Sequence, residues 1–276
     1  YHAALEPSNS GTATNPITFA AYPNELPKIN ITSFANGWES DYCIGTGNRN
    51  YIIWDGFECT AMNGEYMGGC MIGGDLGGSQ FCTIRNSTFH GGSHIISHTD
   101  NAELIRMENT SYTTIQNCKI YNARQASNWP NTCGIKMYYN DHATIENCEI
   151  YNCTAATHIK CENDYITIRN NYVHNNYHGI YGTAYNTRTN DYGKAYNNLI
   201  VNNSCTSFFL SVDSDTGTNN NWQFYNNTIY HPNGSGDCFI YGNGKNWNIY
   251  NNILITRSGT LNLKTIRLSS ITSCDH

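Results

Sequence analysis

Short stretches in which hydrophobic and polar residues alternate recur along most of the chain. In the clearest copies an Ile stands two positions before an Asn, and a second apolar residue stands three positions after it. These apolar positions are Ile84, Ile115, Ile145 and Ile168 before the Asn, and Phe89, Ile120, Ile150 and Val173 after it. Alternation with a period of two is typical of half-buried β-strands, whereas an α-helix repeats about every 3.6 residues. The pattern therefore predicts short strands and argues against a helical repeat.

The repeated unit is clearest in TIENCEIYN at Thr144–Asn152, which resembles TIQNCKIYN at Thr114–Asn122 and TIRNNYVHN at Thr167–Asn175. The first Asn of each copy marks the repeat at Asn86, Asn117, Asn147, Asn170, Asn197, Asn226 and Asn251, with spacings between 23 and 31 residues. Such periods are typical of solenoids and propellers, but a propeller blade needs about 40 residues. The unit therefore predicts one coil of a parallel β-helix, with successive coils stacked about 4.8 Å apart.

In that geometry the recurring Asn has a physical role. Its amide offers two donors and an acceptor, so equivalent Asn side chains on successive coils can bond each other and the turn backbone. Each buried polar group is then satisfied. We expect these residues to form an Asn ladder. In YIIWDGFEC, Tyr51–Cys59, Asp55 is expected to stand in place of the Asn.

The repeats predict a single domain over residues 1–276, because a solenoid has no separate cores. Irregular first coils are expected in 1–50, with strands at Ile17 to Tyr22 and Lys28 to Ile31, regular coils in 51–256, and a last coil or cap in 257–276. The chain starts at Tyr1 without a signal peptide, which is expected of a mature or trimmed chain lacking an N-terminal segment.

The composition argues against a nucleic-acid-binding or membrane-spanning protein and favours a secreted one. Charged residues make up 13% of the chain, the net charge is −6 and there is no basic run, so nucleic acid is not an expected partner. No apolar stretch is long enough to span a membrane. Twelve Cys residues and several N-x-S/T strings favour a secreted protein in an extracellular or cell-surface setting. Cys118 and Cys148 hold the same place in adjacent copies, where they form either a disulfide or a buried reduced pair.

NPITFAAYP starting at Asn15, then YIIWDGFEC, then repeated I-x-N-[NC]-x-I-[YH]-N units carry a family resemblance. Together they resemble the bacterial right-handed parallel β-helix proteins related to polysaccharide lyases of the pectate and alginate type. The resemblance covers almost the whole chain. It implies a sugar chain in a groove along one parallel sheet, a Lys or Arg that removes the proton next to a uronate carboxylate, and often calcium that neutralises that carboxylate.

Candidate catalytic residues follow from aligning GIKMYYNDHATIEN with HIKCENDYITIRN. This alignment places Lys136 beside Lys160 on neighbouring coils, with Tyr181 next in line. Two adjacent ammonium groups repel, which favours the neutral amine that acts as a general base. Both Lys residues could equally be solvated surface charges.

Other polar residues fall in the same part of the repeat. They are His94, His98, His142 and His158, of which His158 is taken as a catalytic candidate. Arg106 is a second one, because its guanidinium can pair with a substrate carboxylate.

The same alignment stacks Asp141 on Asp164, with Glu162 alongside. Carboxylate oxygens at one edge suit calcium, which takes six to eight oxygen ligands. An Asn-Asp pair at a strand end is also an ordinary turn signal, so both interpretations stay open.

Aromatic residues recur four positions after the marker Asn, among them Tyr121, Tyr151 and His174. A row of rings on adjacent coils predicts either a platform for sugars, to which Tyr181 would add, or cross-strand stabilisation.

The sequence thus predicts a protein that acts on or binds an acidic polysaccharide, with β-elimination by Lys136 or Lys160 as the sharpest hypothesis. The alternative is a non-catalytic adhesive or filament-forming protein whose open coil ends associate end to end.

Overall fold

The computed structural model describes residues 5–31, 42–61, 68–74, 77–91, 101–185, 187–212, 217–232, 240–242, 244–256, 266–268 and 271–274. Within these ranges the regular structure is made of β-strands. No helix in them is long and apolar enough to cross a membrane.

The strands form three long parallel sheets, called sheets A, B and C, and a short pair, β7 (Ser79–Gln80) with β11 (Thr110–Ser111). Sheet B consists of β1 (Ile17–Ala20), β4 (Ile52–Asp55), β8 (Thr83–Arg85), β12 (Thr114–Gln116), β15 (Thr144–Glu146), β18 (Thr167–Arg169), β21 (Lys194–Tyr196), β24 (Gln223–Tyr225), β27 (Trp247–Tyr250) and β30 (Ile271–Cys274). Sheet C consists of β2 (Lys28–Ile31), β5 (Glu58–Ala61), β9 (Thr88–Gly91), β13 (Lys119–Tyr121), β16 (Glu149–Tyr151), β19 (Tyr172–His174), β22 (Leu199–Val201), β25 (Thr228–His231) and β28 (Ile253–Thr256). Sheet A consists of β3 (Ile44–Gly45), β6 (Cys70–Gly73), β10 (Ala102–Glu108), β14 (Thr132–Tyr138), β17 (Ala155–Lys160), β20 (His178–Ala184), β23 (Thr206–Val212), β26 (Ile240–Gly242) and β29 (Ile266–Leu268).

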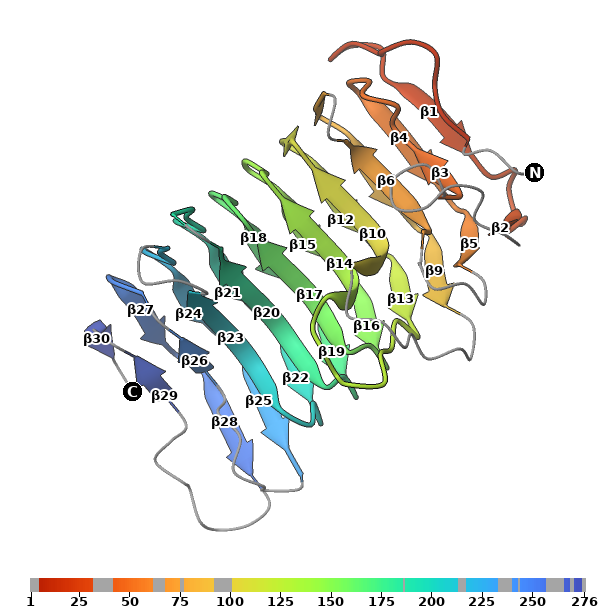
Figure 1. Ribbon diagram of the computed structural model, residues 1–276. Coiled ribbons are helices and arrows are strands. Elements are labelled where there is room, and N and C mark those ends of the chain that lie inside the picture. The colour runs from red at the N-terminus through yellow and green to blue at the C-terminus, as the bar shows by residue number, and fades with distance from the viewer. Residues whose placement is uncertain are drawn as a thin grey trace.

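The chain passes through sheets B, C and A in turn and then begins the next coil, so each strand pairs with its equivalents one coil away (Figure 1). This confirms the predicted parallel β-helix. The two early strands predicted before residue 50 are also present, although β1 ends at Ala20 and not at Tyr22.

The core is built from the apolar positions of the repeat. Ile115 pairs with Ile84 on one side and Ile145 on the other, and all three side chains are fully buried. Ile120 has the same relation to Phe89 and Ile150 in sheet C. Burying one such side chain stabilises the fold by about 1.5–3 kcal/mol, so these rows account for the stacking of successive coils.

The marker Asn residues occupy the corner between sheets B and C, and here the prediction needs a correction. Each takes a left-handed backbone, with φ between 52° and 56°, a conformation that Asn tolerates better than most residues. Their side chains lie at the surface, where Asn117 bonds Asn86. The buried ladder is formed by the next residue: Asn171, Asn198, Asn227 and Asn252, whose side chains are joined from coil to coil.

Asn198 shows how complete this ladder is. Its Nδ2 donates to Ile168 O and to Asn227 Oδ1, each at 3.0 Å. Its Oδ1 accepts the backbone N–H and the side-chain N–H of Asn171 at 3.1 and 3.0 Å. All four hydrogen-bonding positions of a buried amide are therefore used.

Equivalent ladders lie at the other two corners. Asn176 bonds Asn203 between sheets C and A. Asn140, Asn163, Asn190 and Asn219 form the ladder between sheets A and B. Asp55 does not replace a marker Asn: it pairs with Arg85 at the end of the strand, and Gly56, with φ 85°, takes the left-handed corner.

A stack of six rings, called the corner stack, lies beyond the ladder between sheets A and B. It comprises Tyr51, Phe81, Tyr112, His142, Tyr165 and Tyr192, with ring centroids 4.6 to 5.0 Å apart. Each of these residues has a positive φ, which is strained for a bulky side chain. Ring stacking stabilises the folded state by about 0.5–1.5 kcal/mol per pair and so offsets this strain. His142 belongs to this stack.

Ten cysteines whose side chains the structure describes are free thiols, and nine of these are buried. Cys118 and Cys148 do hold equivalent positions on adjacent coils. They occupy the inward corner position between sheets B and C that is taken by Asn171 and the other ladder residues in the later coils. Cys118 donates to Gln116 O and Cys148 to Glu146 O. The reduced pair is therefore the alternative that the structure supports.

We expect Asn198→Ala to lower the free energy of unfolding by about 2–3 kcal/mol, because buried groups of Asn171 and Ile168 lose their partner. Urea unfolding followed by circular dichroism measures this. The matched control is Asn197→Gly, since Gly accepts the left-handed backbone of this exposed neighbour and should change stability by less than about 0.5 kcal/mol. Equal losses in the two variants would contradict the ladder's role.

We also expect thiol titration without reductant to find at least the ten described thiols after denaturation. Burial raises the pKa of Cys118 well above its usual value, so in the native protein this thiol should react slowly. Peptide mapping of the alkylated protein identifies each site. A peptide pair linked through Cys118 and Cys148 would show that the disulfide forms instead.

Candidate functional site

The outer face of sheet A gathers most of the candidate residues. Strand register places Arg106 of β10 beside Lys136 of β14, then His158 of β17 and Tyr181 of β20. The row continues to Phe209 of β23. Because the coils are parallel and in register, residues far apart in sequence become neighbours about 4.8 Å apart. Four predicted site residues thus share one row.

Lys160 is not in this row, so its predicted stacking on Lys136 is wrong. Lys136 pairs instead with His158, which lies two residues before Lys160 in the sequence. Lys160 pairs with Thr183 of β20. The cause lies between Lys160 and the ladder residue Asn163. Cys161 and Glu162 both take left-handed conformations there and accommodate an extra residue in this coil. Lys160 still lies near the site, with its ammonium 5.8 Å from the ring centre of Tyr138.

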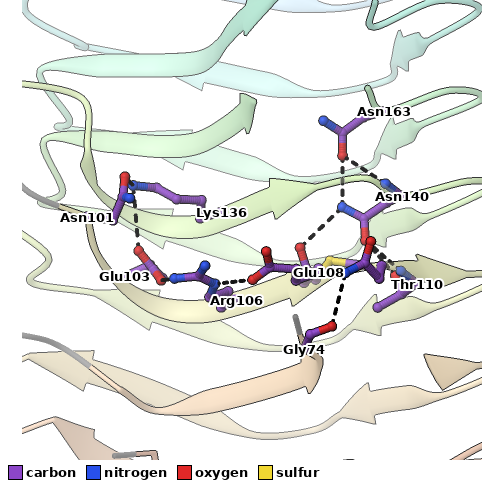
Figure 2. Close-up of polar contacts among 11 residues, drawn as sticks. Gly74, Asn101, Glu103, Arg106, Glu108, Thr110, Lys136, Asn140 and Asn163 are labelled. Atoms are coloured by element: carbon purple, nitrogen blue, oxygen red, sulfur yellow. Dashed lines mark hydrogen bonds and ion pairs between the residues drawn. The ribbon is translucent and has the colours of Figure 1, made fainter. Parts of the chain in front are cut away.

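A chain of charged groups crosses β10 on this face (Figure 2). Arg106 donates to Glu108 at 2.7 Å and lies 3.3 Å from Glu103. Glu103 also lies 3.5 Å from the ammonium of Lys136. The positive groups are therefore partly neutralised by carboxylates that the sequence analysis did not identify. Glu103 gave no signal of its own because it lies outside the repeated strings.

Lys136 is fully buried. Its ammonium donates to Asn101 Oδ1 at 3.0 Å and to the backbone carbonyl of Asn131, in addition to its ion pair with Glu103. An ammonium surrounded by acceptors is well placed to hold and orient, and poorly placed to accept a proton. The predicted role of Lys136 as a general base is not favoured by this geometry.

His158 has the features that a base requires. Its Nδ1 lies 3.0 Å from the carbonyl oxygen of Pro130, and because a carbonyl only accepts, Nδ1 carries the proton. Nε2 therefore holds a lone pair, and it is buried without a hydrogen-bond partner. Burial, reinforced by the charges of Lys136 and Lys160, lowers the pKa of His158 well below its usual value. The imidazole is neutral near pH 7.

Pro130 and Asn131 belong to a segment, residues 122–131, that we call the strap. It connects β13 to β14, and Figure 1 shows it as a yellow-green loop beside β14 and β17. Asn131 Oδ1 lies 3.5 Å from the ammonium of Lys160. The strap also carries Trp129, whose side chain is 53% exposed. Sequence reasoning missed the strap because it interrupts the repeat.

The predicted sugar-stacking residues lie elsewhere. Tyr121, Tyr151 and His174 form a stack on sheet C with ring centroids 4.9 Å apart and nearly parallel planes. Neighbouring rings cover each other's faces, which favours the stabilising interpretation over a platform. Tyr181 is on sheet A, where it stacks on Phe209 and meets the edge of His158.

The predicted metal ligands do not converge. Asp141 pairs with Asp164 across the coils, as expected. Asp164 accepts the backbone N–H of Asp191, while Glu162 pairs with Arg188 at 2.7 Å. Within the described ranges, no group of three or more His, Cys, Asp or Glu side chains is arranged to hold a metal ion. These residues therefore do not fit calcium, and we derive no chemical step through it. His94 and His98 lie outside the described residues.

The site predicts a pH dependence of stability. Burial lowers the pKa of His178, which lies beside Tyr181, to about 4. The unfolded chain binds a proton near pH 6.5 and the folded chain does not, so stability falls as the pH drops from about 6.5 towards 4. We expect a loss of up to about 3 kcal/mol from this group. His178→Gln should flatten the curve measured by urea unfolding over this range; an unchanged slope would contradict the assignment.

Comparison with solved structures supports the fold. An alginate lyase from Paenibacillus sp. str. FPU-7 superimposes with a TM-score of 0.69 at 16% identity, covering 98% of this chain and 88% of its own. The pectate lyase Pel9A gives a TM-score of 0.59 at 16% identity, covering 91% of this chain. This chain spans only 64% of that lyase.

A third structure is a tailspike protein of E. coli bacteriophage HK620 in complex with a pentasaccharide. It superimposes with a TM-score of 0.61 at 10% identity, covering 83% of this chain and 43% of the tailspike. At such identities the likeness establishes the fold alone. No curated protein sequence matches the chain.

The model of the right-handed β-helix region matches residues 103–265, more than half of the chain. This range contains the sheet A row and the strap. The match, the parallel three-sheet coil and the resemblance to lyase structures agree, and the chain belongs to the family of right-handed β-helix proteins.

Proposed function

We propose that this protein binds a uronate-containing polysaccharide on the outer face of sheet A and cleaves it by β-elimination. The observation that carries the proposal is the neutral, unpartnered Nε2 of His158, in line with Arg106 and Lys136. The structural resemblance to a pectate lyase and an alginate lyase supports the same substrate class. An exported protein would meet such a polysaccharide outside the cell.

In the proposed step, Nε2 of His158 takes the proton on the carbon next to the uronate carboxylate. The electron pair of that C–H bond forms a carbon–carbon double bond, and the bond to the glycosidic oxygen breaks. The leaving oxygen takes a proton from a hydroxyl donor, for which Tyr181 is the candidate because it is next in the row. General base catalysis of this kind contributes about 10²–10⁴-fold to rate.

The charges around His158 suit an anionic sugar. Arg106, Lys136 and Lys160 are positive, while Glu103 and Glu108 are negative, so the group carries one net positive charge with His158 neutral. A carboxylate next to the scissile proton becomes more negative as that proton leaves. Positive groups near it therefore stabilise the transition state more than the ground state.

Glycan binding without cleavage is a second candidate. It is favoured by the complete burial of Lys136 and by the nearly complete burial of His158 beneath the strap. Glycan binding on this fold is supported by the tailspike protein, which resembles this chain in structure and is in complex with a pentasaccharide.

We expect the protein to release unsaturated oligosaccharides from pectate or alginate, seen as a rise in ultraviolet absorbance. His158→Ala should lower the rate by about 100-fold or more. His142→Gln is the matched control, because His142 lies in the corner stack and should leave the rate unchanged.

No absorbance change with any uronate would remove the lyase mechanism. Isothermal titration with the same glycans would then test binding alone, and no binding would remove the second candidate as well. Equal rates for His158→Ala and the parent protein would show that another group is the base.

A further inference from the structure

The strap, residues 122–131, lies on the proposed site in a way that closing the coil does not require. The same connection between sheets C and A runs only from 152 to 154 in the next coil and from 175 to 177 in the one after. The short versions turn the corner with Asn152 and Asn175 in left-handed conformations. Asn122 turns the corner in the same way, so most of the strap is extra chain.

The strap contacts the site through its own polar groups. The carbonyl of Pro130 accepts from His158 Nδ1 at 3.0 Å, and the carbonyl of Asn131 accepts from the ammonium of Lys136. The side-chain oxygen of Asn131 lies 3.5 Å from Lys160 Nζ. Three of the proposed site residues are thus contacted by oxygen atoms of two consecutive residues, which is how oxygen atoms of a sugar would contact them.

The cover leaves buried polar atoms unsatisfied. His158 Nε2 and Tyr138 Oη are buried and have no hydrogen-bond partner. Buried polar groups are normally satisfied, so two unpartnered polar atoms on one face indicate that this arrangement is not the one with the most favourable polar contacts. A ligand rich in hydroxyl groups could supply both donors and acceptors to them.

Little apolar packing holds the strap down. Ala123, Gln125 and Pro130 are buried, whereas residue 124 and residues 126–129 are exposed. Its other anchors include the bond from Gln125 N to Thr154 Oγ1 at 2.8 Å and that from Thr154 N to Ala123 O at 2.7 Å. The end next to β14 is also held by the bond from Ala102 N to Asn131 O at 3.0 Å. Segments with few buried apolar contacts open at low free energy.

We propose that the strap is a displaceable lid that occupies the glycan site with its own carbonyl groups, and that the glycan binds after the strap leaves His158 and Lys136. Trp129 is part of this lid. It is the exposed aromatic residue closest in sequence to the contacts with the site, and its ring takes part in none of the ring stacks found in the described residues. This inference rests on the proposed function for the identity of the ligand.

Lid opening can be measured without any glycan. Diethyl pyrocarbonate modifies neutral imidazole, and peptide mass spectrometry gives a rate for each His. In the parent protein we expect His158 to react much more slowly than His142, which is exposed. Pro130→Gly loosens the strap, because Gly raises the entropy of the open chain, and should speed modification of His158 about two- to fivefold.

Pro23→Gly, at an exposed position far from the strap in sequence, is the matched control and should leave the rate at His158 unchanged. His174 on sheet C serves as an internal reference in all three proteins. The lid is disproved if His158 of the parent reacts as fast as His142, or if Pro130→Gly leaves the rate at His158 unchanged.

A glycan arm separates this inference from the proposed function. If uronates bind, Pro130→Gly should lower the apparent Kd by the same two- to fivefold, because a larger fraction of the protein is competent to bind. An unchanged Kd would disprove the lid. If the labelling rates behave as expected and no uronate binds either protein, the lid stands and the proposed function falls.

Discussion

The structure depends on satisfying the polar groups that each coil buries where it turns. A coil changes direction at three corners, and at each corner backbone and side-chain polar atoms enter the interior. The Asn ladders solve this problem, because one amide can both donate to the next coil and accept from the previous one. Asn198, with four bonds to neighbouring coils, shows the result. Once the corners are fixed, the strands between them have no freedom to slip.

That fixed register is what makes a site possible. A strand of sheet A contributes one outward residue to each row, so a row collects its members from coils more than 20 residues apart. Arg106, Lys136 and His158 come together in this way. The charges then interact across strands: Glu103 joins Arg106 to Lys136, and the two lysines disfavour the charged form of His158. The chemistry of the face is therefore a property of the stack and not of any single coil.

The same geometry separates aromatic residues with different roles. Rings in register on adjacent coils lie face to face, so Tyr121 and Tyr151 present only their edges to solvent. Such stacks support the fold. Trp129 is different because it sits on an irregular connection and not on a strand. In a solenoid, side chains on irregular connections are not stacked on equivalent side chains of the next coil. Such side chains remain available to contact a ligand.

Much of the fold could be predicted from the sequence because its determinants are local. The alternation around Ile115 and Ile145 specifies strands, and Asn at the corners specifies the turns. The prediction erred on which of two consecutive residues forms the buried ladder, because in later copies both are Asn. Only the folded chain shows that Asn197 takes the left-handed turn while Asn198 points inward.

The sequence by itself determined that the chain is a parallel β-helix and which residue types its coils would offer. It also identified Arg106, Lys136, His158 and Tyr181 as candidates. The tertiary structure decided how they are arranged. One extra residue near Cys161 and Glu162 shifted Lys160 out of the row, and a long connection placed Pro130 and Asn131 over His158 and Lys136. Both outcomes depend on differences in coil length, of one residue near Cys161 and of several in the strap, and on contacts between distant segments, which no local pattern encodes.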